Sequence, residues 1–169
     1  EAVKAPRPAK NTAALYVYSP DVDPAGAAFD APAAPEGKPD TMVSAINRTM
    51  KDEMAANPRI VMFGEDVADA THELKLKEVQ GKGGVFKVTH GLQKAFGSVR
   101  VFNAPLAEAD IVGRAVGMAV RGIKPAGETP LLDYIRPAMM QLRNEVALMR
   151  YRSANTSPLS MRVKLPAAQ

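Results

Sequence analysis

Two glutamates of this 169-residue chain stand where a predicted strand gives way to the next element, Glu65 and Glu108. Glu108 lies in NAPLAEADIVG, between an apolar strand pattern and a helix pattern. A carboxylate in the first turn of a helix is stabilised by the helix dipole, so Glu108 suits a capping role. The same place suits a group that hydrogen-bonds a ring nitrogen of a ligand or exchanges a proton with it. The spacing leaves both interpretations open.

The remaining candidates for chemistry carry weaker signals. GKGG at 81–84 lacks the spacing and the following hydroxyl of a phosphate-binding loop. Gly113 and Gly117 lie four apart inside a predicted helix, so we expect them to permit close packing. His90 precedes a predicted helix, where it suits loop ordering or substrate contact. With no Cys and only two His, composition excludes thiolate and all-histidine metal sites, and we predict no metal ligands in this chain.

Alternating helix and strand patterns must position these side chains. Short, branched apolar runs predict strands buried in a parallel sheet, and longer runs with a repeat near 3.6 residues predict helices. Glu65 then follows the first strand at the carboxyl edge of the sheet, where open α/β sheets bind ligands. The fold class is therefore α/β, a three-layer sandwich with a mainly parallel sheet. The predicted strands are 59–63, 99–104, 124–128 and 159–165, and the predicted helices are 41–56, 91–96, 108–121 and 133–152.

Charge and proline divide the chain at residue 40. Residues 1–40 hold seven of the 14 prolines and carry four basic and six acidic side chains, a net charge of −2. We therefore expect an extended arm or linker, in which LYVYS at 15–19 forms a short strand or lies on a partner surface. Residues 41–169 form the predicted α/β domain, and the basic excess lies at its C-terminal end. Because no aromatic platform or basic motif accompanies that excess, nucleic-acid binding is the remote alternative.

Five motifs occur in series and carry a family resemblance. GEDVADA, GKGGVFKVTHGLQKAFG, RVFNAPLAEADIVGRAVGMAVRG, LDYIRPAMMQLRNE and MRYRS resemble the beta subunit of the decarboxylating component of 2-oxo acid dehydrogenase complexes. The resemblance covers 41–153, and the arm resembles the junction of relatives whose alpha and beta parts are fused. It implies the pyrimidine-binding fold of thiamine diphosphate enzymes, acting in oxidative decarboxylation with acyl transfer to lipoyl groups.

The resemblance also implies roles and partners. Glu108 would be the catalytic residue and would contact the cofactor pyrimidine, together with Glu65, Leu106 and Leu132. The diphosphate and its Mg²⁺ would be held by an alpha part, and a lipoyl-bearing acyltransferase would accept the acyl group. A homo-oligomer in the cytoplasm is expected. No apolar run approaches the roughly 20 residues of a membrane-spanning helix, so no membrane association is expected.

Departures from the family pattern support an alternative. Leu131, Leu132 and Arg136 stand where relatives carry aromatic side chains, which weakens the expected pyrimidine contact. The chain also lacks an initiating Met and stops before the second beta domain, so we expect an excised fragment that is inactive by itself, with or without bound cofactor. The alternative is a stand-alone excised or redesigned, non-catalytic domain that self-associates.

Overall fold

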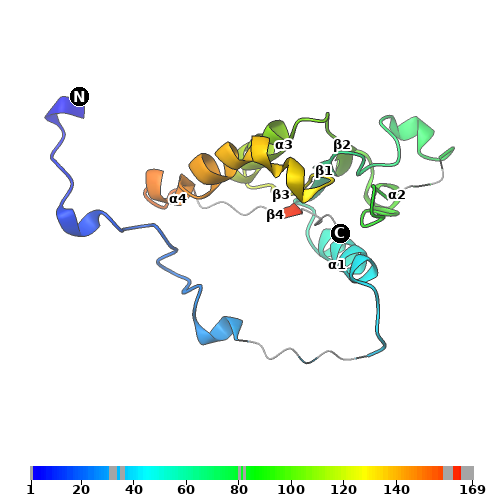
Figure 1. Cartoon of the computed structure of the whole chain (residues 1–169), viewed down its shortest axis with the longest axis horizontal. Coiled ribbons are helices and arrows are strands. Elements are labelled where there is room, and N and C mark those ends of the chain that lie inside the picture. Colours follow the sequence, from blue (N-terminus) through cyan, green and yellow to red (C-terminus); the bar gives the residue numbers. More distant parts are fainter. Residues whose placement is uncertain are drawn as a thin grey trace.

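Four parallel strands form the centre of the molecule, in the order β2-β1-β3-β4 (Figure 1). The computed structural model describes residues 2–30, 34, 37–79, 81, 83–157 and 162–164. Every strand pair is parallel, so crossover segments must carry the chain from one edge of the sheet back to the other. The predicted α/β class is confirmed. The strands are β1 (Ile60–Gly64), β2 (Val101–Asn103), β3 (Lys124–Glu128) and β4 (Arg162–Lys164).

Helices cover both faces of the sheet. Neighbouring residues of a strand point to opposite faces, so Met62 and Phe63 of β1 belong to different cores. Met62 packs with Met54 of α1 (Met42–Ala56) and Leu92 of α2 (Leu92–Phe96). Phe63 packs with Ile111 of α3 (Glu108–Val120). Figure 1 shows α3 above the strands and α1 below them, which is the expected three-layer sandwich.

The ends of α1 follow local sequence chemistry. The hydroxyl of Thr41 accepts a hydrogen bond from the Ser44 backbone N–H and so caps the first turn. Asn57 adopts an extended conformation before Pro58, because a residue that precedes proline is disfavoured in the helical region. The expected helix at 41–56 is confirmed.

The Arg100 guanidinium joins the end of α1 to the sheet. It donates to the carbonyl oxygens of Met54, Asn57 and Ile60 at 2.8–3.0 Å and lies 5.0 Å from the centre of the Phe96 ring. One side chain therefore satisfies three carbonyls where the helix stops and β1 begins.

The prediction of a single long helix at 133–152 is wrong, because three short helical segments follow one another there. The segment comprises the 3-10 helix η5 (Leu132–Ala138), the π-helix η6 (Gln141–Val146) and the short helix α4 (Met149–Arg152). Pro137 lacks a backbone N–H, so the ladder of a regular helix cannot run through η5. The Ala147 N–H bonds to the Leu142 carbonyl five residues back, which widens the next turn. Ala138 is the fully buried residue of this segment, whereas the predicted stripe is partly buried or exposed, namely Ile135, Met139, Leu142, Val146 and Met149.

Gly113 and Gly117 of α3 behave differently. A Cβ at Gly113 would lie 3.6 Å from the Gln141 side chain, an ordinary contact with η6. A Cβ at Gly117 would meet nothing within 4 Å among the described residues. Because a Cβ would fit at both positions, neither glycine makes the close approach that we expected within the described part of the chain.

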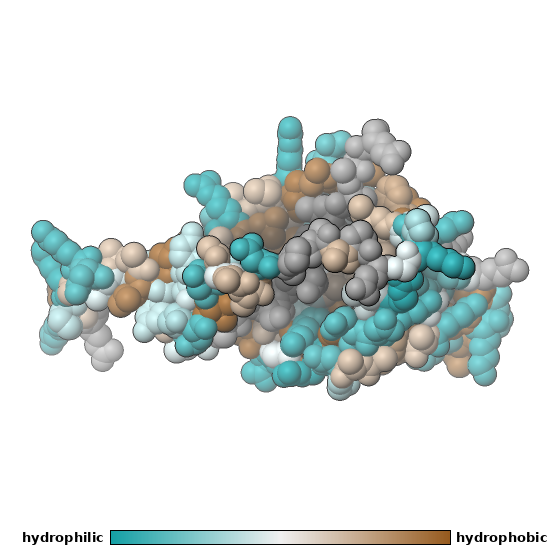
Figure 2. All heavy atoms as spheres, turned by 90° about the horizontal axis from the view of Figure 1, so that it is seen from below, coloured by the Kyte–Doolittle hydropathy of each residue, from teal (hydrophilic) through white to brown (hydrophobic). Residues whose placement is uncertain are grey.

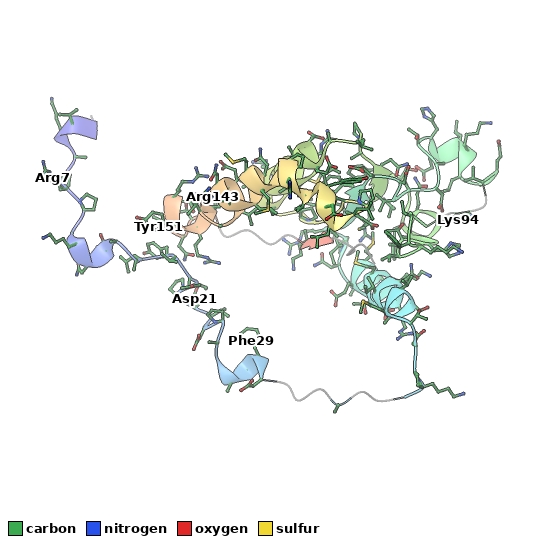
Figure 3. The ribbon with its side chains drawn as sticks, in the orientation of Figure 1. Arg7, Asp21, Phe29, Lys94, Arg143 and Tyr151 are labelled. Carbon is green, nitrogen blue, oxygen red and sulfur yellow. The ribbon has the colours of Figure 1, made fainter. Side chains whose placement is uncertain are left out.

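The segment before α1 projects from the sheet layers (Figure 1). Its three short 3-10 helices are η1 (Ala2–Lys4), η2 (Lys10–Thr12) and η3 (Ala27–Phe29). LYVYS forms turns and not the expected strand, with Tyr18 72% exposed. Figure 2 shows apolar surface on this projecting segment among polar atoms, and Figure 3 shows Asp21 and Phe29 on it. The domain division at residue 40 stays a prediction.

The last predicted strand falls partly outside the described residues. β4 occupies 162–164 and pairs with β3, with Val163 opposite Gly127. Residues 159–161 and 165 lie outside the described part of the chain.

Candidate functional site

Three buried glutamates lie at the carboxyl edge of the sheet. Glu65 follows β1, Glu128 ends β3, and Glu108 begins α3 just after β2. Their exposed fractions are 5%, 2% and 9%. Because parallel strands end at one edge, residues more than 60 positions apart in sequence converge there.

Gly64 allows the two central strands to approach at this edge. A Cβ at Gly64 would lie 2.1 Å from the Glu128 carbonyl oxygen, so only glycine fits. The Glu65 N–H then donates to that same carbonyl at 3.4 Å. The glycine therefore places Glu65 beside the end of β3.

The Glu65 carboxyl group is in an unfavourable environment for a charge. Neither of its oxygens has a hydrogen-bond partner among the described residues. Burial raises the pKa of Glu65 above its ordinary value, and the nearby carboxylates of Glu108 and Asp66 raise it further. Glu65 thus holds a proton more readily than an exposed glutamate and is suited to hydrogen-bond donation and proton exchange.

An open cleft of about 380 Å³ adjoins Glu65. Its apolar walls include Leu106 from the segment after β2, and Leu131 and Tyr134 from the segment after β3. Leu106 is 81% exposed and forms part of the rim. Leu132 begins η5, is 43% exposed and does not line this cleft, so Leu131 stands where we expected Leu132.

These residues fit an aminopyrimidine ring, the group that the resemblance leads us to expect. A protonated carboxyl group can donate to a ring nitrogen, and a buried carboxyl without protein partners has that capacity unused. The apolar cleft walls suit the faces of a flat ring. Among the described residues, no group of three or more His, Cys, Asp or Glu is arranged to hold a metal ion.

The structure separates the predicted residues into two places. Glu65, Glu108 and Leu106 gather at the acidic edge, whereas His90 is exposed and lines a different cavity beside α1. Sequence reasoning missed Glu128 and Thr129, which are 2% and 0% exposed at the same edge. The sequence feature that could have pointed to them is their position at the end of the predicted strand 124–128.

An open parallel sheet with an acidic cleft at its carboxyl edge defines an α/β ligand-binding domain. Residues 38–165 match the family described as transketolase, pyrimidine binding domain. The chain belongs to this family, as the motifs in series led us to expect.

Three relatives are about 40% identical to this chain over the aligned segment. It is 40% identical over 126 residues to the 2-oxoisovalerate dehydrogenase subunit beta of Pseudomonas aeruginosa, covering 75% of this chain and 33% of the relative. It is 39% identical over 126 residues to the pyruvate dehydrogenase E1 component subunit beta of Staphylococcus epidermidis, covering 75% and 35%. It is 41% identical over 127 residues to the 3-methyl-2-oxobutanoate dehydrogenase subunit beta of Mycobacterium tuberculosis, covering 75% and 33%. The chain thus spans about a third of the length of these relatives.

In the described part of the chain, no helix is long and apolar enough to cross a membrane. The cytoplasmic location stays a prediction.

Proposed function

We propose that this chain supplies the pyrimidine-binding half of a thiamine diphosphate site in a 2-oxo acid dehydrogenase. The observation that carries the proposal is Glu65, a buried carboxyl without a hydrogen-bond partner among the described residues, electrostatically coupled to Glu108 beside an open cleft. The family match and the names of the relatives support the same class of reaction.

Glu108 and Glu65 have different roles toward the pyrimidine ring. Glu108 hydrogen-bonds a ring nitrogen of the pyrimidine and exchanges a proton with it, which makes it the catalytic residue. Glu65 stays protonated more readily because of its burial and its neighbours, so it donates a hydrogen bond and limits repulsion of Glu108. Leu106 and Leu131 present apolar surface to the ring and exclude water. When bound, the cofactor supplies the nucleophilic carbon and the electron sink for decarboxylation of the 2-oxo acid.

The remaining parts of the active site come from partners under this proposal. An alpha part holds the diphosphate and Mg²⁺, and a lipoyl-bearing acyltransferase accepts the acyl group. The exposed rim residue Leu106 and the openness of the cleft support a covering partner at this edge. The chain is inactive by itself, and the full enzyme is a homo-oligomer of such assemblies.

A second candidate is a stand-alone, non-catalytic domain that self-associates. Met139, Met140, Leu148 and Tyr151 are each at least 42% exposed on the segment from η5 to α4. Figure 3 shows Arg143 and Tyr151 at this end of the molecule. Sedimentation at two concentrations tests this candidate, since self-association through such a face increases with concentration.

Titration by NMR tests the cofactor proposal without requiring activity. Thiamine diphosphate with Mg²⁺, added to the full chain at millimolar concentration, is expected to shift the backbone amides of Glu65 and Glu108 saturably. Glu108→Gln weakens the interaction by about tenfold or more, since it loses a charge-assisted hydrogen bond.

Glu78→Gln is the matched control, because Glu78 is an exposed glutamate that pairs with Lys75. It is expected to leave the titration unchanged. Absence of saturable shifts in the unmodified chain, or equal weakening by Glu78→Gln, would overturn the proposal.

A further inference from the structure

A second cavity, of about 650 Å³, lies between α1 and the loop of residues 83–91. Val43, Ser44 and Asn47 line it from α1, and Gly81, Gly84, Lys87 and His90 line it from the opposite side. None of these residues lines the acidic cleft. Its volume falls within the range of sites for small organic ligands.

The cavity differs from the acidic cleft in charge. Two of its lining side chains are basic, Lys87 and His90. The Asp69 carboxylate lies behind the wall at Gly81, and one of its oxygens accepts a hydrogen bond from the Gly83 N–H at 3.2 Å. Lys51 of α1 lies beside the same loop, since a Cβ at Gly91 would be 3.8 Å from its Nζ atom. The neighbouring Arg48 is engaged elsewhere, in an ion pair with Asp40 at 2.9 Å. Lys87, His90 and Lys51 together thus present more basic side chains to the cavity than the one carboxylate of Asp69, which favours an anionic ligand.

Hydrogen bonds hold the loop against α1. The Asn47 amide donates to the carbonyl oxygens of Val88 and His90, at 2.6 and 3.0 Å. The Thr89 hydroxyl donates to the Val67 carbonyl at 2.8 Å, and the Thr89 N–H donates to the Gly83 carbonyl at 3.2 Å. The loop thus has a defined conformation that positions its side chains before any ligand binds.

Lys87 is held in a strained conformation at the cavity wall. Its φ of 60° lies in the left-handed region, where a lysine is uncommon and glycine is favoured. Backbone strain of this kind persists where the surrounding structure imposes it, and it concentrates at functional sites. The chain therefore keeps a basic side chain where glycine would fit the backbone better.

We propose that this cavity binds the phosphoryl group of a small phosphate ester. Lys87 provides a point charge of the kind that binds phosphate, with His90 as a second donor. The Ser44 hydroxyl accepts a hydrogen bond from Thr41 at 2.9 Å, so its own proton is available to a phosphate oxygen. Val43 provides apolar surface for the organic part of the ligand.

Titration of the full chain with glycerol 3-phosphate, followed by NMR, tests this site. The backbone amides of Ser44, Gly84 and Lys87 are expected to shift saturably. Inorganic phosphate is titrated in parallel. If glycerol 3-phosphate binds more tightly than inorganic phosphate, the cavity also contacts the organic part of the ester. If the two affinities are equal, the cavity contacts only the phosphoryl group.

Lys87→Gly is the decisive variant, because it removes the charge and also relieves the backbone strain. The variant is therefore expected to fold at least as well as the unmodified chain but to bind about tenfold more weakly or worse. Lys94→Met removes one lysine from α2 outside the cavity lining (Figure 3) and is expected to change the affinity by less than about twofold. The proposal is overturned if no saturable shifts occur, or if Lys94→Met weakens binding as much as Lys87→Gly.

Discussion

Replacing Glu65 by glutamine is expected to stabilise the fold in a pH-dependent way. Both Glu65 oxygens are buried and lack hydrogen-bond partners among the described residues, and two carboxylates repel the charged form. Leaving one buried polar group unsatisfied costs about 1–3 kcal/mol, and more when it is charged. Glu65→Gln removes the charge but leaves an amide that is equally buried and unpaired, so only the extra cost of the charged form is recovered. We therefore expect a gain of about 1 kcal/mol in the free energy of unfolding near pH 8.

The direction of the pH dependence follows from proton linkage. The folded-state pKa of Glu65 is raised, so the folded chain binds this proton more tightly than the unfolded chain. The stabilisation that comes from this bound proton is therefore lost as the pH rises from the ordinary glutamate pKa of about 4.3 through the raised pKa of Glu65. Below about pH 4 both states are protonated, and the advantage of Glu65→Gln is expected to vanish.

Urea unfolding from pH 4 to pH 8 measures this effect. Glu78→Gln is the matched control, since Glu78 is an exposed glutamate outside the acidic cleft. Its effect is expected to stay within about 0.5 kcal/mol. A Glu65→Gln chain that is less stable than the unmodified chain at pH 8, or a difference that does not change with pH, would refute the reasoning, because Glu65 would then be paired.

Three further predictions concern the fold around the site. Arg100→Met removes a donor from three carbonyls, of which that of Asn57 keeps the Ile60 N–H, and we expect it to lower the free energy of unfolding by about 2–4 kcal/mol in urea. The exposed Arg59→Met is expected to change this free energy by less than about 0.5 kcal/mol, and equal effects would contradict the role of Arg100. Gly64→Ala brings a Cβ to 2.1 Å from the Glu128 carbonyl oxygen and is expected to cost more than about 3 kcal/mol or to prevent folding. Gly117→Ala is expected to gain up to about 1 kcal/mol in thermal or urea unfolding, and a loss there would show that this helix face is buried against another copy.

The regular elements were predictable because their signals are local. The run RIVMF at 59–63 is short, apolar and branched, and it corresponds to β1 at 60–64. Thr41 precedes an amphipathic pattern and caps α1 as expected. The segment 132–152 was not predictable as it stands, because its apolar pattern suits a helix while Pro137 and the widened turn at Ala147 depend on how the segment packs against α3.

The site shows a similar division. Glu108 and Glu65 were identifiable because each follows a strand pattern directly. Leu132 was expected at the cleft because the family resemblance implied a pyrimidine contact there, but only the bend into η5 decides that Leu131 lines the cleft instead. Residues 83–91 belong to a family motif and include the candidate His90, but no local pattern gave the shape of this loop. Its hydrogen bonds to Asn47 join Val88 and His90 to a residue more than 40 positions away.

The amino-acid sequence by itself determined the order of helices and strands, the family resemblance and the two glutamates of interest, because these depend on short-range patterns. The tertiary structure alone decided that Glu128 joins them, that Glu65 is buried without a hydrogen-bond partner among the described residues, and that Lys87 and His90 line a separate cavity. The physical reason is that burial and charge coupling depend on distances between residues far apart in the chain, and the parallel sheet sets those distances.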